Sequence, residues 1–220
     1  TSLGELPRWI GEDIPVPFSV AQEASQRLAD GNWADLPITR EALEVLQKYH
    51  ESIADAGVMP SPVCLTVEQH ERLFILNYPG GSRLNRTIGM IVTAMLTAKS
   101  GYKIGFQFDP YRIILDVPAR TTVKDLLAIL KGFVPEVGSL LRFAIKDSPS
   151  LKPQLLHSAR KMGAIAPDAD IGKFGMKKLM EAYSDTPLYT EAVERFLFHQ
   201  LDEDGMEEFI LQINSGEIDV

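Results

Sequence analysis

The chain of 220 residues is 45% hydrophobic and 24% charged, which excludes a disordered or fibrous protein and is typical of one domain or two small ones. Its single cysteine, Cys64, excludes an internal disulfide, so we expect a reducing, cytoplasmic environment. No apolar run approaches the roughly 18–20 residues of a membrane span, so we expect no membrane partner. The sequence starts at Thr1 and not at methionine, and we expect it to be a piece of a longer protein.

The net charge of −8 is distributed unevenly along the chain. Residues 1–80 hold 5 Lys/Arg against 12 Asp/Glu, residues 81–180 hold 16 against 7, and residues 181–220 hold 1 against 11. An acidic total argues against a nucleic-acid partner, whereas a basic centre between acidic ends indicates a polyanion site in the middle third. The alternative is that basic and acidic helices pair within one fold, and both interpretations stay open on the charges alone.

Residues 1–60 predict an extended lead-in followed by two acidic helices. Three prolines before Ser19 exclude an earlier helix, and we expect Ser19 to cap a helix that ends near Ala29. Thr39 is expected to cap the second helix, which ends before Pro60. One stripe of that helix is apolar and carries Leu43, Leu46 and Ile53.

Residues 61–118 predict an antiparallel sheet of about four strands with one inserted basic helix. Apolar and polar residues alternate with a period of two in the last two strand segments, which a turn at Asp109-Pro110 joins. The polar residues 68–71 are expected to form the turn of the first hairpin. The expected strands cover residues 63–67, 72–77, 102–109 and 112–117, and the expected helix covers residues 82–99.

Residues 119–220 predict a helical region punctuated by prolines. Asp204 and Glu207 are expected to form a capping box at the start of its last helix. The expected helices cover residues 122–133, 135–147, 150–162, 174–183, 189–201 and 205–214. The predicted fold class is therefore α+β, a small antiparallel sheet with an inserted helix followed by a helical C-terminal region. The three regions together are expected to form one compact fragment of a larger protein.

The turn Pro79-Gly80-Gly81 places Arg83 and Arg86 at the start of the inserted helix. Paired glycines allow a tight turn, Ser82 is expected to cap the helix, and backbone N–H groups with two guanidinium groups favour a phosphate. The alternative is a capped strand-to-helix turn whose arginines are solvated or paired with acids of the fold, because such glycine turns are common. No Gly-Lys-Ser/Thr follows at the spacing of a P-loop.

Two further pairs of residues are candidate nucleic-acid contacts. Trp9 can stack on an unpaired base while the adjacent Arg8 holds a phosphate, although burial of the ring in a core is the alternative. Arg160 and Lys161 end a basic stretch of a predicted helix that either faces a nucleic-acid backbone or is a solvated face. No catalytic or metal-binding constellation is recognisable, because the four histidines are scattered and the acidic pairs lack a general acid.

Several segments in a fixed order carry a resemblance to a known family. The first of these segments contains Pro7-Arg8-Trp9, and the second contains the glycine turn. The five segments are residues 7–23, 76–86, 109–115, 157–163 and 213–218. They resemble the DEAD/DEAH-associated accessory domain of large helicase-related (Lhr-type) superfamily 2 ATP-dependent helicases. Trp9 matches a tryptophan that is a proposed nucleic-acid contact in that family, whereas Asn77 stands where many relatives have histidine.

The resemblance implies a parent protein with two RecA-like motor lobes that bind ATP and Mg²⁺, then a winged-helix domain, then this region. Such a parent translocates 3′ to 5′ on single-stranded DNA, with RNA or a hybrid as alternatives, and unwinds duplexes in DNA repair. This chain alone is then expected to hold no cofactor and to be no enzyme, and its partners are single-stranded DNA and the motor and winged-helix domains of the same chain.

Residues and resemblance together predict an accessory nucleic-acid-binding module that guides a single strand beside the motor. The expected contacts are Arg8, Trp9, Arg83, Arg86, Arg160 and Lys161. The alternative is a protein-interaction or structural bracing domain without nucleic-acid contact, which the acidic outer helices and their amphipathic faces favour. An independent enzyme is the third hypothesis, and no cluster of residues supports it.

Overall fold

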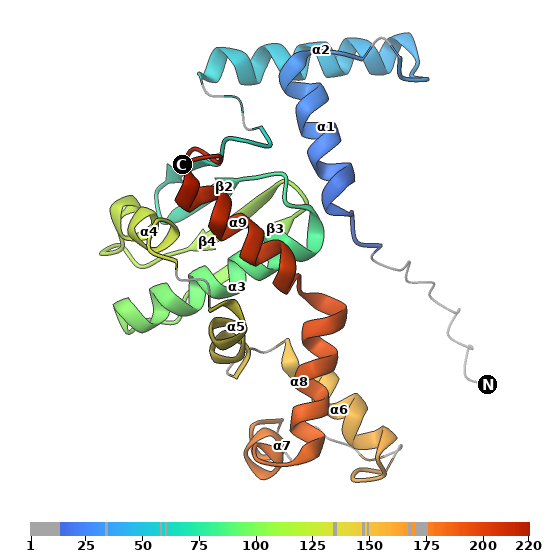
Figure 1. Ribbon diagram of the computed structural model, residues 1–220, viewed down its shortest axis with the longest axis vertical. Helices are drawn as coiled ribbons and strands as arrows, with labels where there is room; N and C mark the ends of the chain where they lie inside the picture. Colours follow the sequence, from blue (N-terminus) through green and yellow to red (C-terminus); the bar gives the residue numbers. More distant parts are fainter. Residues whose placement is uncertain are drawn as a thin grey trace, which may run out of the picture.

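The computed structural model describes residues 14–33, 35–57, 59, 61–133, 136–146, 148, 150–166, 169 and 176–220. These residues form an α+β fold with one four-stranded antiparallel sheet, so the predicted fold class is confirmed (Figure 1). The strands are β1 (Thr66–His70), β2 (Leu73–Asn77), β3 (Gly105–Asp109) and β4 (Arg112–Asp116). The helices are α1 (Phe18–Asp30), α2 (Arg40–Ala56), α3 (Gly81–Ser100), α4 (Val123–Leu130), α5 (Val137–Lys146), α6 (Leu151–Lys161), α7 (Met176–Tyr183), α8 (Pro187–Gln200) and α9 (Glu203–Ser215).

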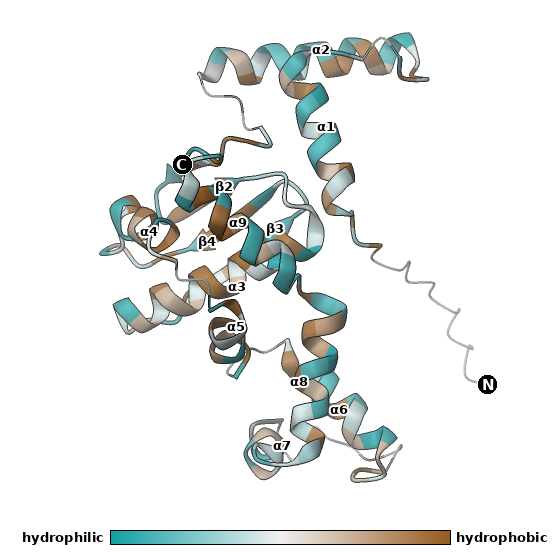
Figure 2. Ribbon diagram, in the orientation of Figure 1, coloured by the Kyte–Doolittle hydropathy of each residue, from teal (hydrophilic) through white to brown (hydrophobic). Residues whose placement is uncertain are grey.

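The sheet has the strand order β1-β2-β4-β3, and one of its faces forms the centre of the core. In the register of β2 and β4, Phe74 lies opposite Leu115 and Leu76 lies opposite Ile113, and all four side chains are fully buried. Alternation with a period of two places these residues on one face, which packs against α3. Figure 2 shows the hydrophobic residues of β2, β4 and α3 concentrated in the middle of the molecule.

The first hairpin differs from its prediction. The turn lies at Glu71, whose φ is +52°, and the polar residues Glu68, Gln69 and His70 belong to β1 instead of the turn. An edge strand tolerates polar side chains because one of its faces and one of its sides are open to solvent. Likewise β3 begins only at Gly105, because the chain leaves α3 through Gly101, whose φ is +72°.

Of the four predicted helix caps, at Ser19, Thr39, Ser82 and Asp204 with Glu207, only the cap at Thr39 is confirmed. Thr39 caps α2 as predicted, because its hydroxyl accepts a hydrogen bond from Ala42 N at 3.3 Å. Helix α1, in contrast, starts at Phe18 after Pro17, and no side chain caps it, so the prediction for Ser19 is wrong. Helix α9 starts two residues earlier than predicted because the Asp202 carboxylate accepts from Gly205 N at 3.1 Å, which places the expected capping box inside the helix.

The C-terminal helices extend away from the sheet and then return to it. Helices α6, α7 and α8 pack together at one end of the long axis, whereas α9 lies against α3 (Figure 1). After α9 the chain pairs with the segment before β1, where Leu65 N donates to Asp219 O and Asp219 N donates to Val63 O, each at 2.9 Å. The helical region is therefore joined to the sheet at two places.

Helices α1 and α2 form an arm at the opposite end of the long axis (Figure 1). Helix α1 packs on α3, and α2 runs across the end of α1 that lies farther from α3. His50 of α2 donates through Nδ1 to Leu28 O at 2.7 Å. The rings of Trp33 and His50 contact each other edge to face, with their centroids 5.7 Å apart. No helix within the described ranges is long and apolar enough to cross a membrane.

Candidate nucleic-acid interface

The glycine turn before α3 is a junction of three chain segments. Gly81 has φ +71°, and a Cβ at this position would lie 2.9 Å from the backbone oxygen of Val16. Only glycine fits both the left-handed conformation and this close approach. Val16 N donates to the Ser82 hydroxyl and Ser82 N donates back to Val16 O, each at 2.9 Å. The lead-in segment is thereby fixed against the start of α3.

These contacts change the predicted role of the helix N-terminus. Gly81 N donates to Pro110 O at 3.0 Å, so the first two amides of α3 already have backbone acceptors. The N-cap residue is Gly80 and no side chain caps the helix, so the predicted cap by Ser82 is wrong. Its hydroxyl is instead the acceptor for Val16 N. A phosphate at this turn would therefore depend on side chains and not on the leading amides.

The buried side chain of Asn85 joins the glycine turn before α3 to the β3–β4 hairpin. The side chain is fully buried, and its Nδ2 donates to Tyr78 O and to Asp109 O, each at 2.9 Å. One amide group thus links the carbonyl of Tyr78, which precedes the glycine turn, to the carbonyl of Asp109 at the end of β3. The sequence signal for this role was a polar residue among the apolar positions of the inserted helix, which sequence reasoning overlooked.

Arg83 binds the end of α8. Its Nε donates to Leu201 O at 2.9 Å, and its Nη2 donates to Phe198 O at 2.8 Å. The last carbonyls of a helix lack partners within the helix and carry a partial negative charge, so they suit a guanidinium group. The neighbouring Thr87 hydroxyl accepts from Asp202 N at 2.9 Å and continues the junction of α3 with the α8–α9 loop.

Arg86 lies between two aromatic rings. Its Cζ is 5.2 Å from the centroid of the Phe196 ring and 5.8 Å from that of Phe108, and its Nη1 donates to the Gln200 side chain. Distances below about 6 Å are those of favourable cation–π contacts. Both arginines of the glycine turn are therefore held by the fold, Arg83 by backbone carbonyls and Arg86 by contacts that include an amide and two rings.

Arg83 and Arg86 lie in a groove of about 710 Å³ between the start of α3, the β3–β4 turn, α6 and the end of α8. We call it the basic groove, and its principal lining residues are Arg83, Arg86, Phe108, Gln154, Arg195 and His199. Its carboxylate, Asp109, accepts from Arg112 Nε at 2.6 Å and from Tyr111 N at 2.8 Å, so hairpin groups compensate it. Three guanidinium groups thus give the groove a positive charge.

Helix α6 contributes Gln154 to the lining of the basic groove. His157 and Lys161 are exposed and follow Gln154 at three and seven residues, a spacing that places the three on one face of a helix. Arg160 follows His157 by three residues and is exposed as well, and its Nη2 donates to Ala169 O at 3.5 Å. Of the predicted contacts among the described residues, Arg83 and Arg86 line the basic groove, whereas Arg160 and Lys161 do not.

Two predicted contacts, Arg8 and Trp9, lie outside the described residues. Pro15, near the start of the described chain, lines the basic groove. Sequence reasoning did not identify Arg195, His199, Gln154 or Phe108. A weak signal existed for Arg195, which is the one Lys/Arg residue of the acidic block 181–220.

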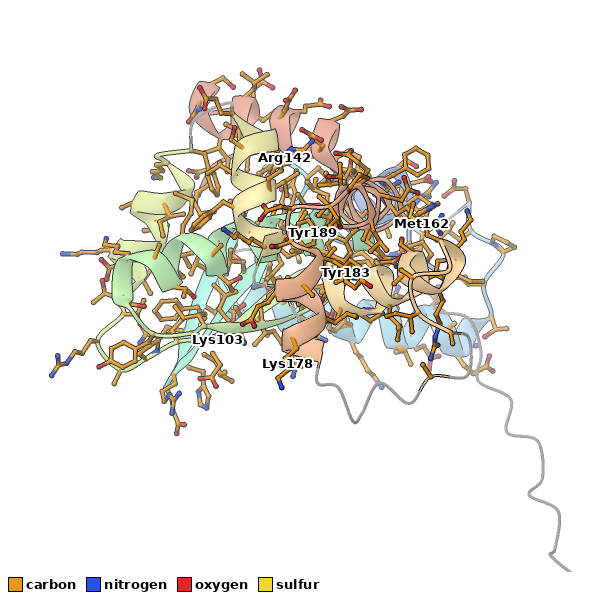
Figure 3. The ribbon with its side chains drawn as sticks, turned by 90° about the horizontal axis from the view of Figure 1, so that it is seen from below. Lys103, Arg142, Met162, Lys178, Tyr183 and Tyr189 are labelled. Carbon is orange, nitrogen blue, oxygen red and sulfur yellow. The ribbon has the colours of Figure 1, made fainter. Side chains whose placement is uncertain are left out.

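Of the seven ion pairs of the described residues, three lie within residues 1–80 and two lie within the basic centre, residues 81–180. Lys99 contacts Asp125 at 2.7 Å, and Arg142 of α5 contacts Glu194 of α8 at 2.9 Å. Only the second of these pairs joins the basic centre to the acidic C-terminal block. Figure 3 shows Arg142 above Tyr183 and Tyr189 in the view from the end where α6, α7 and α8 lie. Within the described part of the chain, no group of three His, Cys, Asp or Glu side chains is placed to hold a metal ion.

The family model for DEAD/H associated proteins matches residues 59–220, more than half of the chain. The chain belongs to the DEAD/H-associated family. The family resemblance of the ordered segments is thereby confirmed. A comparison of this DEAD/H-associated chain with curated proteins finds no match.

The fold of the DEAD/H-associated chain also occurs in a solved structure, that of the Mycobacterium smegmatis helicase Lhr bound to ssDNA and AMP-PNP. The TM-score is 0.68 at 17% sequence identity, and the match covers 99% of this chain and 32% of that chain. The chain thus spans about a third of the length of the helicase that it resembles. At this identity the similarity shows a common fold.

Proposed function

We propose that this DEAD/H-associated chain is an accessory nucleic-acid-binding module of a cytoplasmic, Lhr-type ATP-dependent 3′–5′ helicase acting in DNA repair. It would guide single-stranded DNA beside motor lobes and a winged-helix domain of the same parent, and those lobes would bind ATP and Mg²⁺. The basic groove is the observation that carries this proposal, because it gathers Arg83, Arg86 and Arg195 beside the exposed ring of Phe108. The solved helicase of the same fold is bound to ssDNA, which supports this choice of ligand.

The groove suits a polyanion without regard to sequence. Guanidinium groups neutralise phosphates and release counterions, which gives affinity but no base preference. Arg83 and Arg86 are already held by α8, so little side-chain entropy remains to be lost when a phosphate binds. A guanidinium group has five N–H donors, and the described bonds of Arg83 use only its Nε and Nη2. Arg8 and Trp9, which lie outside the described residues, remain proposed contacts of the single strand.

A pair of charge variants tests the proposal by fluorescence polarisation with a labelled single-stranded oligonucleotide. Arg195→Gln should weaken binding several-fold and reduce the slope of log affinity against log salt by about one, because one phosphate contact is lost. The matched control is Arg40→Gln, which removes the same charge from the exposed start of α2. Binding that is absent, that ignores salt, or that both variants weaken equally contradicts the proposal.

The alternative function, bracing of other domains, is favoured by one specific observation. None of the described side chains of α2 is fully buried, and Val45 and Tyr49 are 66% and 55% exposed. An apolar helix face on a projecting arm is typical of a surface that meets another domain. Val45→Ser combined with Tyr49→Ser should lower the melting temperature of the whole parent protein but not that of this chain alone. Equal effects on both would contradict the bracing function.

A further inference from the structure

The edge strand β3 carries two phenylalanines on one face. Phe106 lies opposite Leu115 and Phe108 lies opposite Ile113, so both rings project to the side of the sheet that packs on α3. Their ring centroids are 6.0 Å apart and the ring planes differ by 32°. Phe108 is nevertheless 38% exposed and Phe106 is half-buried, because β3 is the outermost strand.

Each of the two rings lines a different groove. Phe108 lines the basic groove, whereas Phe106 lines a second groove of about 560 Å³ between α3, β3 and the end of α5. We call the second one the aromatic groove, and its other principal lining residues are Phe143, Lys103, Ile104, Ala94 and Ala98. Both volumes fall in the range of ligand sites, about 300–1,000 Å³. The grooves meet at the Phe106–Phe108 pair.

The local packing fixes the orientation of the Phe106 ring. A Cβ at Gly89 of α3 would lie 2.5 Å from the Cδ2 and Cε2 atoms of this ring, so the ring lies against the helix backbone at the glycine. Across the aromatic groove, Phe143 of α5 is 58% exposed. Lys103, labelled in Figure 3, comes from the α3–β3 loop and adds a positive charge to the lining.

We propose that Phe108, Phe106 and Phe143 form a stacking platform for successive unpaired bases of a single strand. This inference rests on the proposed function, because the phosphates of the same strand would lie in the basic groove. Stacking on aromatic rings accepts every base and adds affinity without sequence preference.

The positive side chains at both ends of the path favour a nucleic acid as the occupant over an apolar peptide. Arg83, Arg86 and Arg195 lie at one end of the path and Lys103 lies at the other, with phenylalanine rings between them. A chain that places a negative charge beside each ring matches this alternation, whereas an apolar peptide would leave the cations without partners. A single strand has this pattern along its whole length.

The test compares a single-stranded oligonucleotide with an abasic strand of equal length, which keeps the phosphates and lacks the bases. Phe108→Leu combined with Phe143→Leu should weaken binding of the normal strand about tenfold, the change expected for the loss of one to two stacked bases. The affinity for the abasic strand and the salt dependence should not change. Phe143→Leu alone, on an exposed surface, should weaken binding about threefold and does not threaten the fold.

Phe198→Leu is the matched control, because Phe198 is 75% exposed on α8 and its ring lies outside both grooves. If the wild type binds normal and abasic strands equally, or if the variants lose both alike, the platform is overturned while a salt-dependent basic groove stands. If the wild type binds neither strand, the proposed function fails and the platform fails with it. Loss of the normal strand alone in the platform variants supports the inference.

Discussion

Arg83→Met tests how strongly the glycine turn is tied to the end of α8. The substitution keeps an unbranched side chain with good helix propensity and removes the bonds from Nε to Leu201 O and from Nη2 to Phe198 O. Each charge-assisted bond to an otherwise unsatisfied carbonyl contributes about 1–1.5 kcal/mol, and the helix dipole adds about 0.3–1 kcal/mol. The expected loss in the free energy of unfolding is therefore about 2–4 kcal/mol, or a fall of roughly 4–16 °C in melting temperature for a chain of this size.

Arg83→Lys separates charge from geometry at the same position. An ammonium group keeps the favourable charge at the helix end but is too compact to reproduce the guanidinium fork, so we expect about half of the loss. Urea denaturation followed by far-ultraviolet circular dichroism measures both variants. Lys178→Met serves as the control, because Lys178 is exposed on α7 and its loss should change stability by less than about 0.5 kcal/mol.

One outcome would refute the reasoning about Arg83 directly. If Arg83→Met unfolds at the same urea concentration and with the same slope as the wild type, the junction between α3 and α8 contributes nothing. If Arg83→Lys is as unstable as Arg83→Met, charge at the helix end is irrelevant and only the fork matters. Because Arg195 and His199 lie on α8, loosening of that helix would also displace two side chains of the basic groove.

Three further changes have defined outcomes. Asn85→Ala should cost about 1–3 kcal/mol in the free energy of unfolding because it removes the donor of the partly buried Asp109 O bond and one of the two donors of Tyr78 O, and an equally stable variant in thermal unfolding would contradict this. Burial raises the pKa of Tyr78 from 10.0 to about 12, so the unfolded chain ionises first, and stability should fall between pH 10 and 12 by about 2–3 kcal/mol. Urea midpoints across that range should fall less steeply for Tyr78→Phe than for the wild type. Thr122→Ala removes the cap of α4 and should cost about 1 kcal/mol at pH 7 in the same assay. The Lys99 ammonium and the Thr122 hydroxyl hold the pKa of Asp125 well below its ordinary value, so the stability that this carboxylate contributes is present at neutral pH and is lost as the pH falls below about 4.

Local patterns predicted the elements of this fold better than their ends. Strand β4 and helix α3 lie close to their predicted ranges because their apolar residues recur with strict periods. The cap at Thr39 was predictable because it acts within its own helix. The start of α1 was not, since residue 16 pairs with residue 82 and fixes the chain at Pro17 by a contact far along the sequence.

The candidate site was predictable only in part, for the same reason. The turn itself indicated Arg83 and Arg86, but their acceptors on α8 lie more than 100 residues downstream, where no local pattern points to them. Arg195 and Gln154 reach the groove through the packing of α8 on α6, which is a property of the folded chain. Phe108 follows the alternation of a core strand, and only the position of β3 at the sheet edge leaves its ring exposed.

The pairing of Leu65 with Asp219 has a consequence for biosynthesis. These residues lie far apart in the chain, yet their backbone bonds complete the segment that leads into β1. A ribosome must therefore release nearly all of the 220 residues before this segment finds its partner. Until residue 219 has been synthesised, the segment before β1 lacks these backbone bonds and remains accessible to chaperones, and translation that stalls earlier would leave the domain without this pairing.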